Sequence, residues 1–93
     1  MNESKLLTVA VTRLVSAMKW YNYALMEGSF SQWQVALAKY ETLRDLLIDS
    51  GHTVEFTSKT DFIGTSPRML FVTVTVDGAE YNVPEFESKG MVV

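Results

Sequence analysis

The sequence predicts an α+β fold in which an antiparallel helical hairpin packs on one face of a three-stranded antiparallel β-meander, in the order ααβββ. Three observations lead to this prediction. Apolar residues recur with helical spacing through the first half of the chain, and the spacing changes to alternation after Gly51. An Asp77-Gly78 pair then separates two alternating apolar runs, as the turn of a β-hairpin does.

The first helix is expected over residues 4–26. Its apolar positions lie four or three residues apart and form one stripe: Leu7, Val11, Leu14, Met18, Tyr21 and Leu25. Together with flanking alanines, the stripe covers an arc of roughly 140° at about 100° per residue. Because one neighbouring element rarely covers so wide an arc, we expect a second helix on one side of it and a sheet on the other.

The second helix is expected over residues 32–50. Ser31 is placed as the N-cap with Gln34 three residues later, which is the pattern of a capping box. Phe30 and Val35 occupy the positions of a hydrophobic staple, so the sequence predicts a sharply defined start for this helix.

The apolar face and the end of the second helix are also visible in the sequence. Ser50-Gly51 supplies a C-terminal stop, and the short connection to the first helix makes the two helices antiparallel neighbours. The residues expected on the buried face are Trp33, Ala36, Leu37, Tyr40, Leu43, Leu47 and Ile48.

Alternating apolar and polar residues predict three strands, over residues 53–58, 69–76 and 79–83. Between the first two strands, Thr60 to Met69 is expected to form a long loop that contains Gly64 and Pro67. Such loops often carry binding residues when a rigid scaffold supports them.

A two-residue turn at Asp77-Gly78 would fix the pairing of the last two strands. The predicted pairs are Val76 with Ala79, Val74 with Tyr81, Val72 with Val83, Thr75 with Glu80, and Thr73 with Asn82. This register places the six apolar side chains on one face and leaves a polar, acidic face. Pro84 ends the third strand, and the tail over 85–93 either docks on the core or frays.

Composition limits the classes of function. A chain of 93 residues is expected to form a single domain, 1–93, and 47% hydrophobic residues are typical of a globular fold. The absence of cysteine excludes disulfides and thiolate sites, and neither a membrane span nor a signal peptide is recognisable, so a cytoplasmic location is expected. The net charge is −3 without a Lys/Arg cluster, so nucleic acid is not an expected ligand.

No pattern of catalytic residues, cofactor binding or metal ligation is recognisable in the chain. His52 is the single histidine and directly follows a predicted helix end, where a histidine commonly interacts with terminal carbonyls. Asp49 and Ser50 lie beside it, but without the glycine-bracketed turn of a serine nucleophile. We therefore expect a protein that is not an enzyme.

Six of the eleven aromatic residues gather around the predicted helix-helix turn: Trp20, Tyr21, Tyr23, Phe30, Trp33 and Tyr40. Helical geometry turns Tyr23 to the polar side, and it is expected to be the best exposed of these rings. The opposing interpretation is that the loop from Lys59 to Arg68, through Phe62 and Ile63, folds over Trp20 and buries it. The interface candidates are Trp20, Tyr23, Met26 and Phe30 at the helix turn, and Phe62, Ile63 and Arg68 in the loop.

The leading hypothesis is a small non-enzymatic protein-binding module, a stoichiometric regulator or inhibitor of a larger protein, of the kind found among bacterial and phage accessory proteins. A homo-oligomeric structural protein that buries its aromatic patch by self-association is the first alternative, and a homodimer is favoured over a monomer. A small-ligand sensor, or an enzyme without a recognisable motif, is the second alternative.

Overall fold

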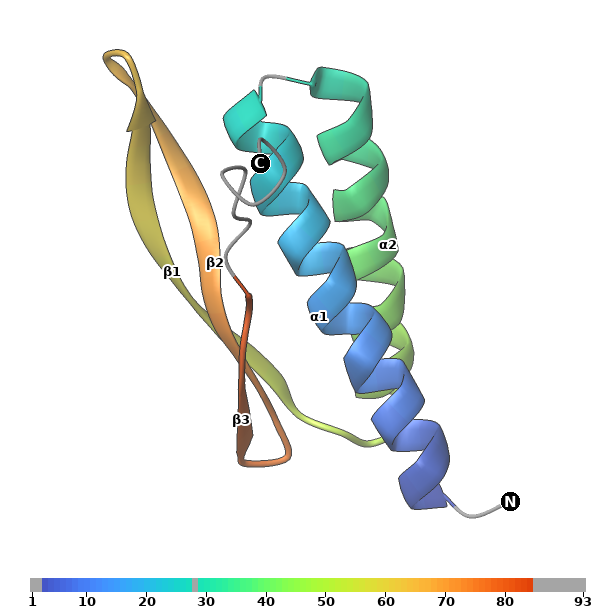
Figure 1. The fold of residues 1–93 in the computed structure, drawn as a ribbon. Helices are drawn as coiled ribbons and strands as arrows, with labels where there is room; N and C mark the ends of the chain where they lie inside the picture. The colour runs from blue at the N-terminus through green and yellow to red at the C-terminus, as the bar shows by residue number, and fades with distance from the viewer. Residues whose placement is uncertain (1–2, 28, 85–93) are drawn as a thin grey trace, which may run out of the picture.

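The computed structural model describes residues 3–27 and 29–84 of the chain. Figure 1 shows two layers, a pair of antiparallel helices beside an antiparallel sheet with the strand order β1-β2-β3. The elements are α1 (Glu3–Glu27), α2 (Phe30–Asp49), β1 (Val54–Ile63), β2 (Ser66–Val76) and β3 (Ala79–Asn82). The predicted α+β fold and its order ααβββ are therefore confirmed. The predicted tail, 85–93, lies outside the described residues.

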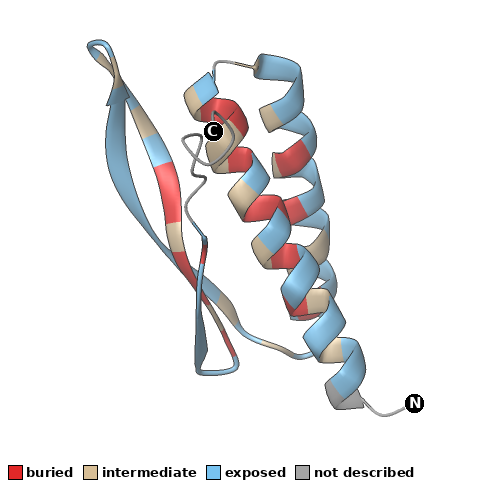
Figure 2. Ribbon diagram, viewed as in Figure 1, coloured by how far each residue is buried: buried red, intermediate tan, exposed pale blue. Residues whose placement is uncertain are grey.

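α1 packs against two elements, α2 and β2. The side chains of Leu14 and Met18 are fully buried, and each such burial contributes about 1.5–3 kcal/mol to stability. Figure 2 shows the buried positions of α1 recurring along one side of the helix. The predicted stripe is buried throughout except for Leu7, which packs against the core while partly exposed: Val11, Leu14, Met18, Tyr21 and Leu25. Two neighbours therefore cover the wide apolar arc, as predicted.

α2 begins two residues before the predicted start, and the predicted capping box is wrong. Ser29 is the N-cap, with φ −89° and ψ 92°, and its carbonyl accepts the first helical hydrogen bond from Trp33 N–H at 3.0 Å. Ser31 consequently lies inside the first turn. Ser29 and Gln32 have the same spacing as Ser31 and Gln34, so the sequence pattern fits both starts. The Ser29 side chain makes no capping hydrogen bond.

α2 ends at the predicted stop. Gly51 adopts φ 94°, and its N–H donates to the Ile48 carbonyl at 3.0 Å, while His52 N–H donates to the Leu47 carbonyl at 2.9 Å. These two bonds form a Schellman motif, which satisfies carbonyls that the helix end leaves open. On the predicted buried face, Ile48 is exposed; the others are buried or partly buried: Trp33, Ala36, Leu37, Tyr40, Leu43 and Leu47.

The predicted Thr60 to Met69 loop is wrong, because these residues extend a long β-hairpin. β1 continues to Ile63, β2 begins at Ser66, and Gly64-Thr65 joins them as a two-residue turn. Gly64 has φ 62° at the first central position, which is the position that a type II′ turn gives to glycine. The segment for which the sequence suggested a long loop is therefore a regular strand pair.

A β-bulge in β2 connects the hairpin to α1. Thr57 pairs with Thr73 but the next residue, Ser58, pairs with Phe71, so β2 carries one extra residue at this point. Asn22 of α1 bonds both backbone groups of Phe71: its Nδ2 donates to the Phe71 carbonyl and its Oδ1 accepts from the Phe71 N–H, each at 2.9 Å. Asn22 thus takes the place of a neighbouring strand and fixes α1 on the sheet.

The β2–β3 hairpin has the predicted turn and register. Asp77 and Gly78 adopt φ 52° and 85°, as a type I′ turn requires. Val74 and Val76 are buried, but Ala79 and Tyr81 are exposed, because β3 is a short edge strand. The pairs confirmed are Val76 with Ala79, Val74 with Tyr81, Thr75 with Glu80, and Thr73 with Asn82, and Val83 N–H donates to the Val72 carbonyl at 2.9 Å.

Phe71 is the aromatic centre where the two layers meet. Its ring centroid lies 5.1 Å from Tyr21 of α1, 4.9 Å from Tyr40 of α2 and 5.1 Å from Phe56 of β1. Because Phe71 is buried and touches three elements, it links both helices to the hairpin.

Candidate protein-interaction surface

The structure separates the aromatic residues of the predicted helix-turn patch. Trp20 and Phe30 are 50% and 62% exposed, whereas Tyr23 and Met26 are partly buried. The expectation that Tyr23 is the best exposed ring is wrong, because its ring packs edge-on against Trp20 at 5.6 Å and it borders a cleft beside the sheet. Trp20 and Phe30 therefore offer the larger apolar area to a partner.

The opposing interpretation of Trp20 can be discarded. In that interpretation a loop from Lys59 to Arg68 covers the ring, but those residues lie in the β1–β2 hairpin, and half of the Trp20 surface remains accessible. The neighbouring Lys19 ammonium lies 6.0 Å from the centre of the indole ring, within the range of a cation–π interaction. Trp20 is thus exposed while its neighbours on α1 hold its orientation.

Trp20 borders a groove between α1 and α2, and residues of these two helices form its walls. The groove has a cavity volume of about 780 Å³. Ala17 and Ala36 are buried at its floor, and a smaller hollow beside Ala24 continues it toward the helix turn. The lining residues are Arg13, Ser16, Ala17, Trp20, Gln32, Val35, Ala36, Ala38, Lys39, Thr42 and Leu43.

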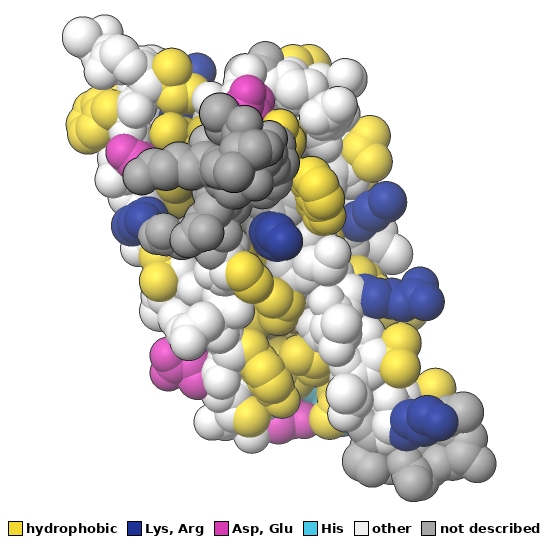
Figure 3. All heavy atoms as spheres, in the orientation of Figure 1, with side chains coloured by type: hydrophobic (Ala, Val, Ile, Leu, Met, Phe, Trp, Pro, Cys, Tyr) yellow, Lys and Arg dark blue, Asp and Glu magenta, His cyan; other side chains and the backbone are white. Residues whose placement is uncertain are grey.

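The groove has an apolar floor and basic margins. Both charged residues that line it, Arg13 on α1 and Lys39 on α2, are basic and exposed. Val35 also lines the groove and is exposed, and it borders the smaller hollow together with Trp20. On the face drawn in Figure 3, Lys and Arg lie mostly over the helices, and Asp and Glu lie mostly along the sheet. The electrostatic potential of the groove therefore favours an acidic ligand.

The tip of the β1–β2 hairpin carries the remaining interface candidates. Phe62 is 57% exposed, whereas Ile63 and Arg68 are partly buried. The Arg68 guanidinium donates from Nη1 to Ser66 Oγ at 2.7 Å and to the Pro67 carbonyl at 3.4 Å. Arg68 is thus bound to its own strand, and Phe62 is the most accessible side chain of this group.

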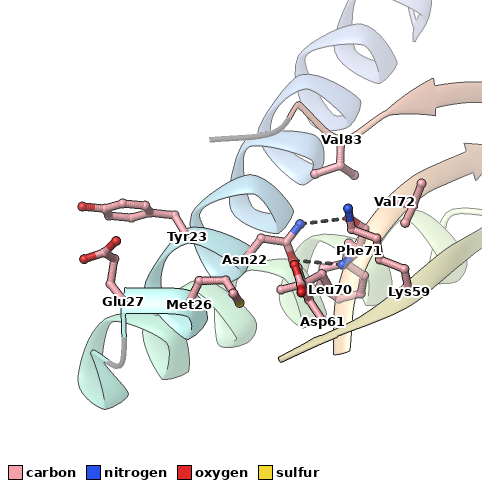
Figure 4. A pocket seen from close by; sticks show the side chains of 10 residues that line it. All are labelled: Asn22, Tyr23, Met26, Glu27, Lys59, Asp61, Leu70, Phe71, Val72 and Val83. Carbon is pink, nitrogen blue, oxygen red and sulfur yellow. Dashed lines mark hydrogen bonds between the residues drawn. The ribbon is translucent and has the colours of Figure 1, made fainter. Parts of the chain in front are cut away.

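A second cleft, of about 320 Å³, separates α1 from the hairpin (Figure 4). Asn22, Tyr23 and Met26 line it from the helix, and Lys59 and Asp61 line it from β1. Figure 4 shows the Asn22 amide directed at the Phe71 backbone, so both polar atoms of this side chain already have partners. Met26 lines the cleft beside the hairpin, whereas the Tyr23 ring is directed away from the hairpin and meets Trp20, which borders the groove, at 5.6 Å.

His52 and Asp77 form a pair that the sequence did not predict. His52 Nδ1 lies 2.6 Å from Asp77 Oδ2, and Thr53 N–H donates to Asp77 Oδ1 at 2.9 Å. The backbone hydrogen bond from Thr53, and after it the bond to His52, hold the pKa of the Asp77 carboxyl below its ordinary value. The pair fastens the β2–β3 turn to the segment after α2, which is a structural role.

Residues 3–27 and 29–84 contain no group of three or more His, Cys, Asp or Glu side chains placed to hold a metal ion. Within the same part of the chain, neither helix is long and apolar enough to cross a membrane. We compared the chain with protein-family models, with curated proteins and with solved structures, and none of the three comparisons gave a match.

Proposed function

We propose that this protein is a non-enzymatic protein-binding module that receives an acidic, amphipathic helix of a larger protein in the groove between α1 and α2. Binding of this kind is stoichiometric, so the protein would act as a regulator or inhibitor of that partner. The observation that carries the proposal is the groove itself, with exposed Trp20 and Val35 above a floor of alanines.

The shape of the groove suits a helix. Small residues at a helix surface allow the axis of a neighbouring helix to approach to about 8–10 Å. Ala17 and Ala36 provide such a floor, and Trp20 and Leu43 stand at its sides. An amphipathic helix that lays its apolar face into a groove of this kind uses anchors spaced three or four residues apart. The partner is therefore expected to present an apolar stripe along one helix face.

The charge of the groove suits an acidic partner. Arg13 and Lys39 would face acidic side chains at the margins of the docked helix, where exposed charges contribute mainly to the association rate and to specificity. A second copy of the chain would bring its own Arg13 and Lys39 to the same place. Like charges therefore oppose self-association through this groove, and the charge pattern favours a different protein.

Affinity purification with the parent and three variants tests the proposal. Trp20→Ala removes an exposed aromatic ring inside the groove. Phe62→Ala is the matched control, because it removes an exposed aromatic ring outside the groove. We expect Trp20→Ala to weaken binding of the recovered partner at least about thirtyfold, as truncation of a hot-spot residue does, and Phe62→Ala to bind like the parent. Arg13→Glu should also weaken binding relative to the parent, and by more at low salt than at high salt, because salt screens exposed charges.

The outcomes separate the two candidate surfaces. Loss of the partner with Phe62→Ala and retention with Trp20→Ala would transfer the binding site to the hairpin tip. Retention with both variants, or a partner segment without acidic residues, would contradict the proposed helix-groove interaction. The melting temperatures of the parent and all three variants must agree, so that a loss of binding is not a loss of folding.

A further inference from the structure

β1 is an edge strand along its whole length. In the described sheet it pairs with β2 on one side, and it is ten residues long. Proteins usually protect such edges with proline, charged side chains, a bulge or a covering element. β1 carries Glu55, Lys59 and Asp61, and because these charges have both signs they repel only strands without matching opposite charges. β1 contains no proline, and the bulge of this hairpin is the extra residue of β2. Phe62 N–H donates to Asp61 Oδ1 at 2.8 Å, a local contact that a pairing strand has to replace at this position. The rest of the edge is able to pair with another strand.

The outer half of β1 is also uncovered. α2 reaches β1 through Tyr40, whose ring lies 6.4 Å from Phe56, but every residue from Thr57 to Phe62 is exposed. Figure 1 shows this end of the hairpin diverging from both helices. A two-stranded ribbon is only marginally stable in water, and added strands stabilise it. The exposed half therefore gains most from a further strand.

We propose that two copies of the chain associate through this edge, antiparallel and about a two-fold axis, with Thr60 of one copy opposite Thr60 of the other. Residues 57–63 of the two copies would then form the centre of a continuous sheet. This interface is separate from the helix groove, so a partner helix and a second copy can bind at the same time.

Backbone geometry limits the possible registers. Asp77 N–H donates to the Thr53 carbonyl, so Thr53 faces β2, and alternation turns the even-numbered residues of β1 to the free edge. Antiparallel hydrogen-bonded pairs must therefore join even-numbered residues of both copies. In each register that meets this condition, one residue lies on the two-fold axis, opposite its own copy. Within the exposed half, this residue is Ser58, Lys59, Thr60 or Asp61.

The charges of β1 choose among these registers. With Ser58 at the centre, Glu55 of one copy lies opposite Asp61 of the other. With Lys59 or Asp61 at the centre, that charged residue lies opposite the same residue of the other copy. Like charges directly opposite each other destabilise a sheet. Centring on Thr60 instead places Lys59 of each copy opposite Asp61 of the other, which gives two pairs of opposite charge. These are non-hydrogen-bonded positions, where cross-strand side chains lie closest.

The same register covers exposed apolar surface. Phe62 is 57% exposed and Phe56 is 44% exposed. With Thr60 at the centre, Phe62 of one copy lies opposite Ser58 of the other, and its diagonal neighbour on the same face is Phe56. Diagonal positions remain within reach of aromatic side chains, so association would remove part of both rings from water.

Charge-swapped variants test the interface. Sedimentation equilibrium from micromolar to millimolar concentration should show a monomer–dimer equilibrium for the parent. Lys59→Glu and Asp61→Lys should each weaken dimerisation at least about tenfold, because two attractive pairs become repulsive. Equal amounts of the two variants should form a mixed dimer, because each charge then meets its opposite. Glu55→Lys is the control, since Glu55 lies outside the proposed pairs.

Circular dichroism and melting temperatures verify that the variants fold, and their masses decide the proposal. A parent that stays monomeric to millimolar concentration would overturn it. Dimers of undiminished affinity in both single variants would overturn the β1 interface. Weakening by Glu55→Lys with rescue by Lys59→Glu would instead place Thr57 at the centre, because Glu55 then faces Lys59, and would overturn the Thr60 register.

Discussion

The helical hairpin and the β1–β2 hairpin differ in how they bury their side chains. α1 has an apolar face between α2 and β2, whereas eight of the ten residues of β1 are exposed. β1 is held by its ladder with β2 and by contacts at its inner half, above all Phe56. The helices are therefore stabilised by packing along their whole length. The strand pair is stabilised at its root, the inner half that contains Phe56 and Phe71, while its tip is exposed. This difference predicts how substitutions at the two ends of the hairpin will behave.

The largest expected effect compares the root with the tip. Phe71→Ala removes the buried ring that touches both helices and β1, and should lower the free energy of unfolding by about 3–5 kcal/mol. Phe62→Ala removes an exposed ring of the same size and should change it by about 0.5 kcal/mol or less. Urea denaturation measures both values. Equal losses would mean that the tip is as well packed as the root.

A smaller loss is expected where α1 joins the sheet through side-chain hydrogen bonds. Asn22→Ala leaves the Phe71 N–H and carbonyl without their side-chain partner, which costs about 1–3 kcal/mol. Hydrogen exchange of the Phe71 amide should accelerate at the same time. Asn82→Ala, on the exposed surface of β3, is the control. An unchanged exchange rate in Asn22→Ala would show that the amide pair does not protect this end of β2.

The turn of the second hairpin should tolerate substitution less than its outer surface. Gly78→Val should destabilise by more than about 1 kcal/mol, because φ is 85° at this position and a β-branched residue resists positive φ. A Cβ there would meet no atom within 4 Å, so the cost is conformational and not a clash. Thr75→Ser should matter far less. Equal urea midpoints for the two variants would contradict the importance of the turn.

The smallest effect concerns the His52–Asp77 pair. Because the folded-state pKa of Asp77 is lowered, its contribution to stability is present at neutral pH and is lost as the pH falls through and below the ordinary value of 3.8. Asp77→Asn keeps a residue that accepts positive φ before Gly78 but removes the charge. The parent should be more stable than this variant at about pH 7, and the difference should shrink toward about pH 2. Thermal denaturation across this range measures it, and a difference independent of pH would exclude the carboxylate as its source.

The sequence by itself determined the elements whose signals are local. The spacing from Leu7 to Leu25 is repeated often enough to identify α1 and its buried face, and Ser50-Gly51 fixes the end of α2. Asp77-Gly78 fixes the β2–β3 register, because a two-residue turn leaves no freedom in the pairing of its strands. In each case the residues that specify the structure are neighbours in the chain.

Local signals failed where two conformations fit the same residues. Ser29 and Ser31 both precede a glutamine by three positions, so this spacing fits two starts of α2. In the structure Trp33 N–H donates to the Ser29 carbonyl, which makes Ser29 the N-cap. Gly64-Thr65 lacks the Asn-Gly or Asp-Gly signature, and Pro67 suggested a loop, yet this proline is accommodated in β2 opposite Phe62. The extended ladder with β1 outweighed those weak local preferences.

Only the tertiary structure decided the surface available to a partner. Asn22 meets Phe71 across 49 positions of the chain, and His52 meets Asp77 across 25, distances at which no periodic pattern carries information. Exposure is decided in the same way, since Tyr23 borders the cleft toward the sheet while Trp20, three residues earlier, borders the groove toward α2. A helix pattern gives the direction of each side chain from the axis, but what lies in that direction depends on how the other elements pack.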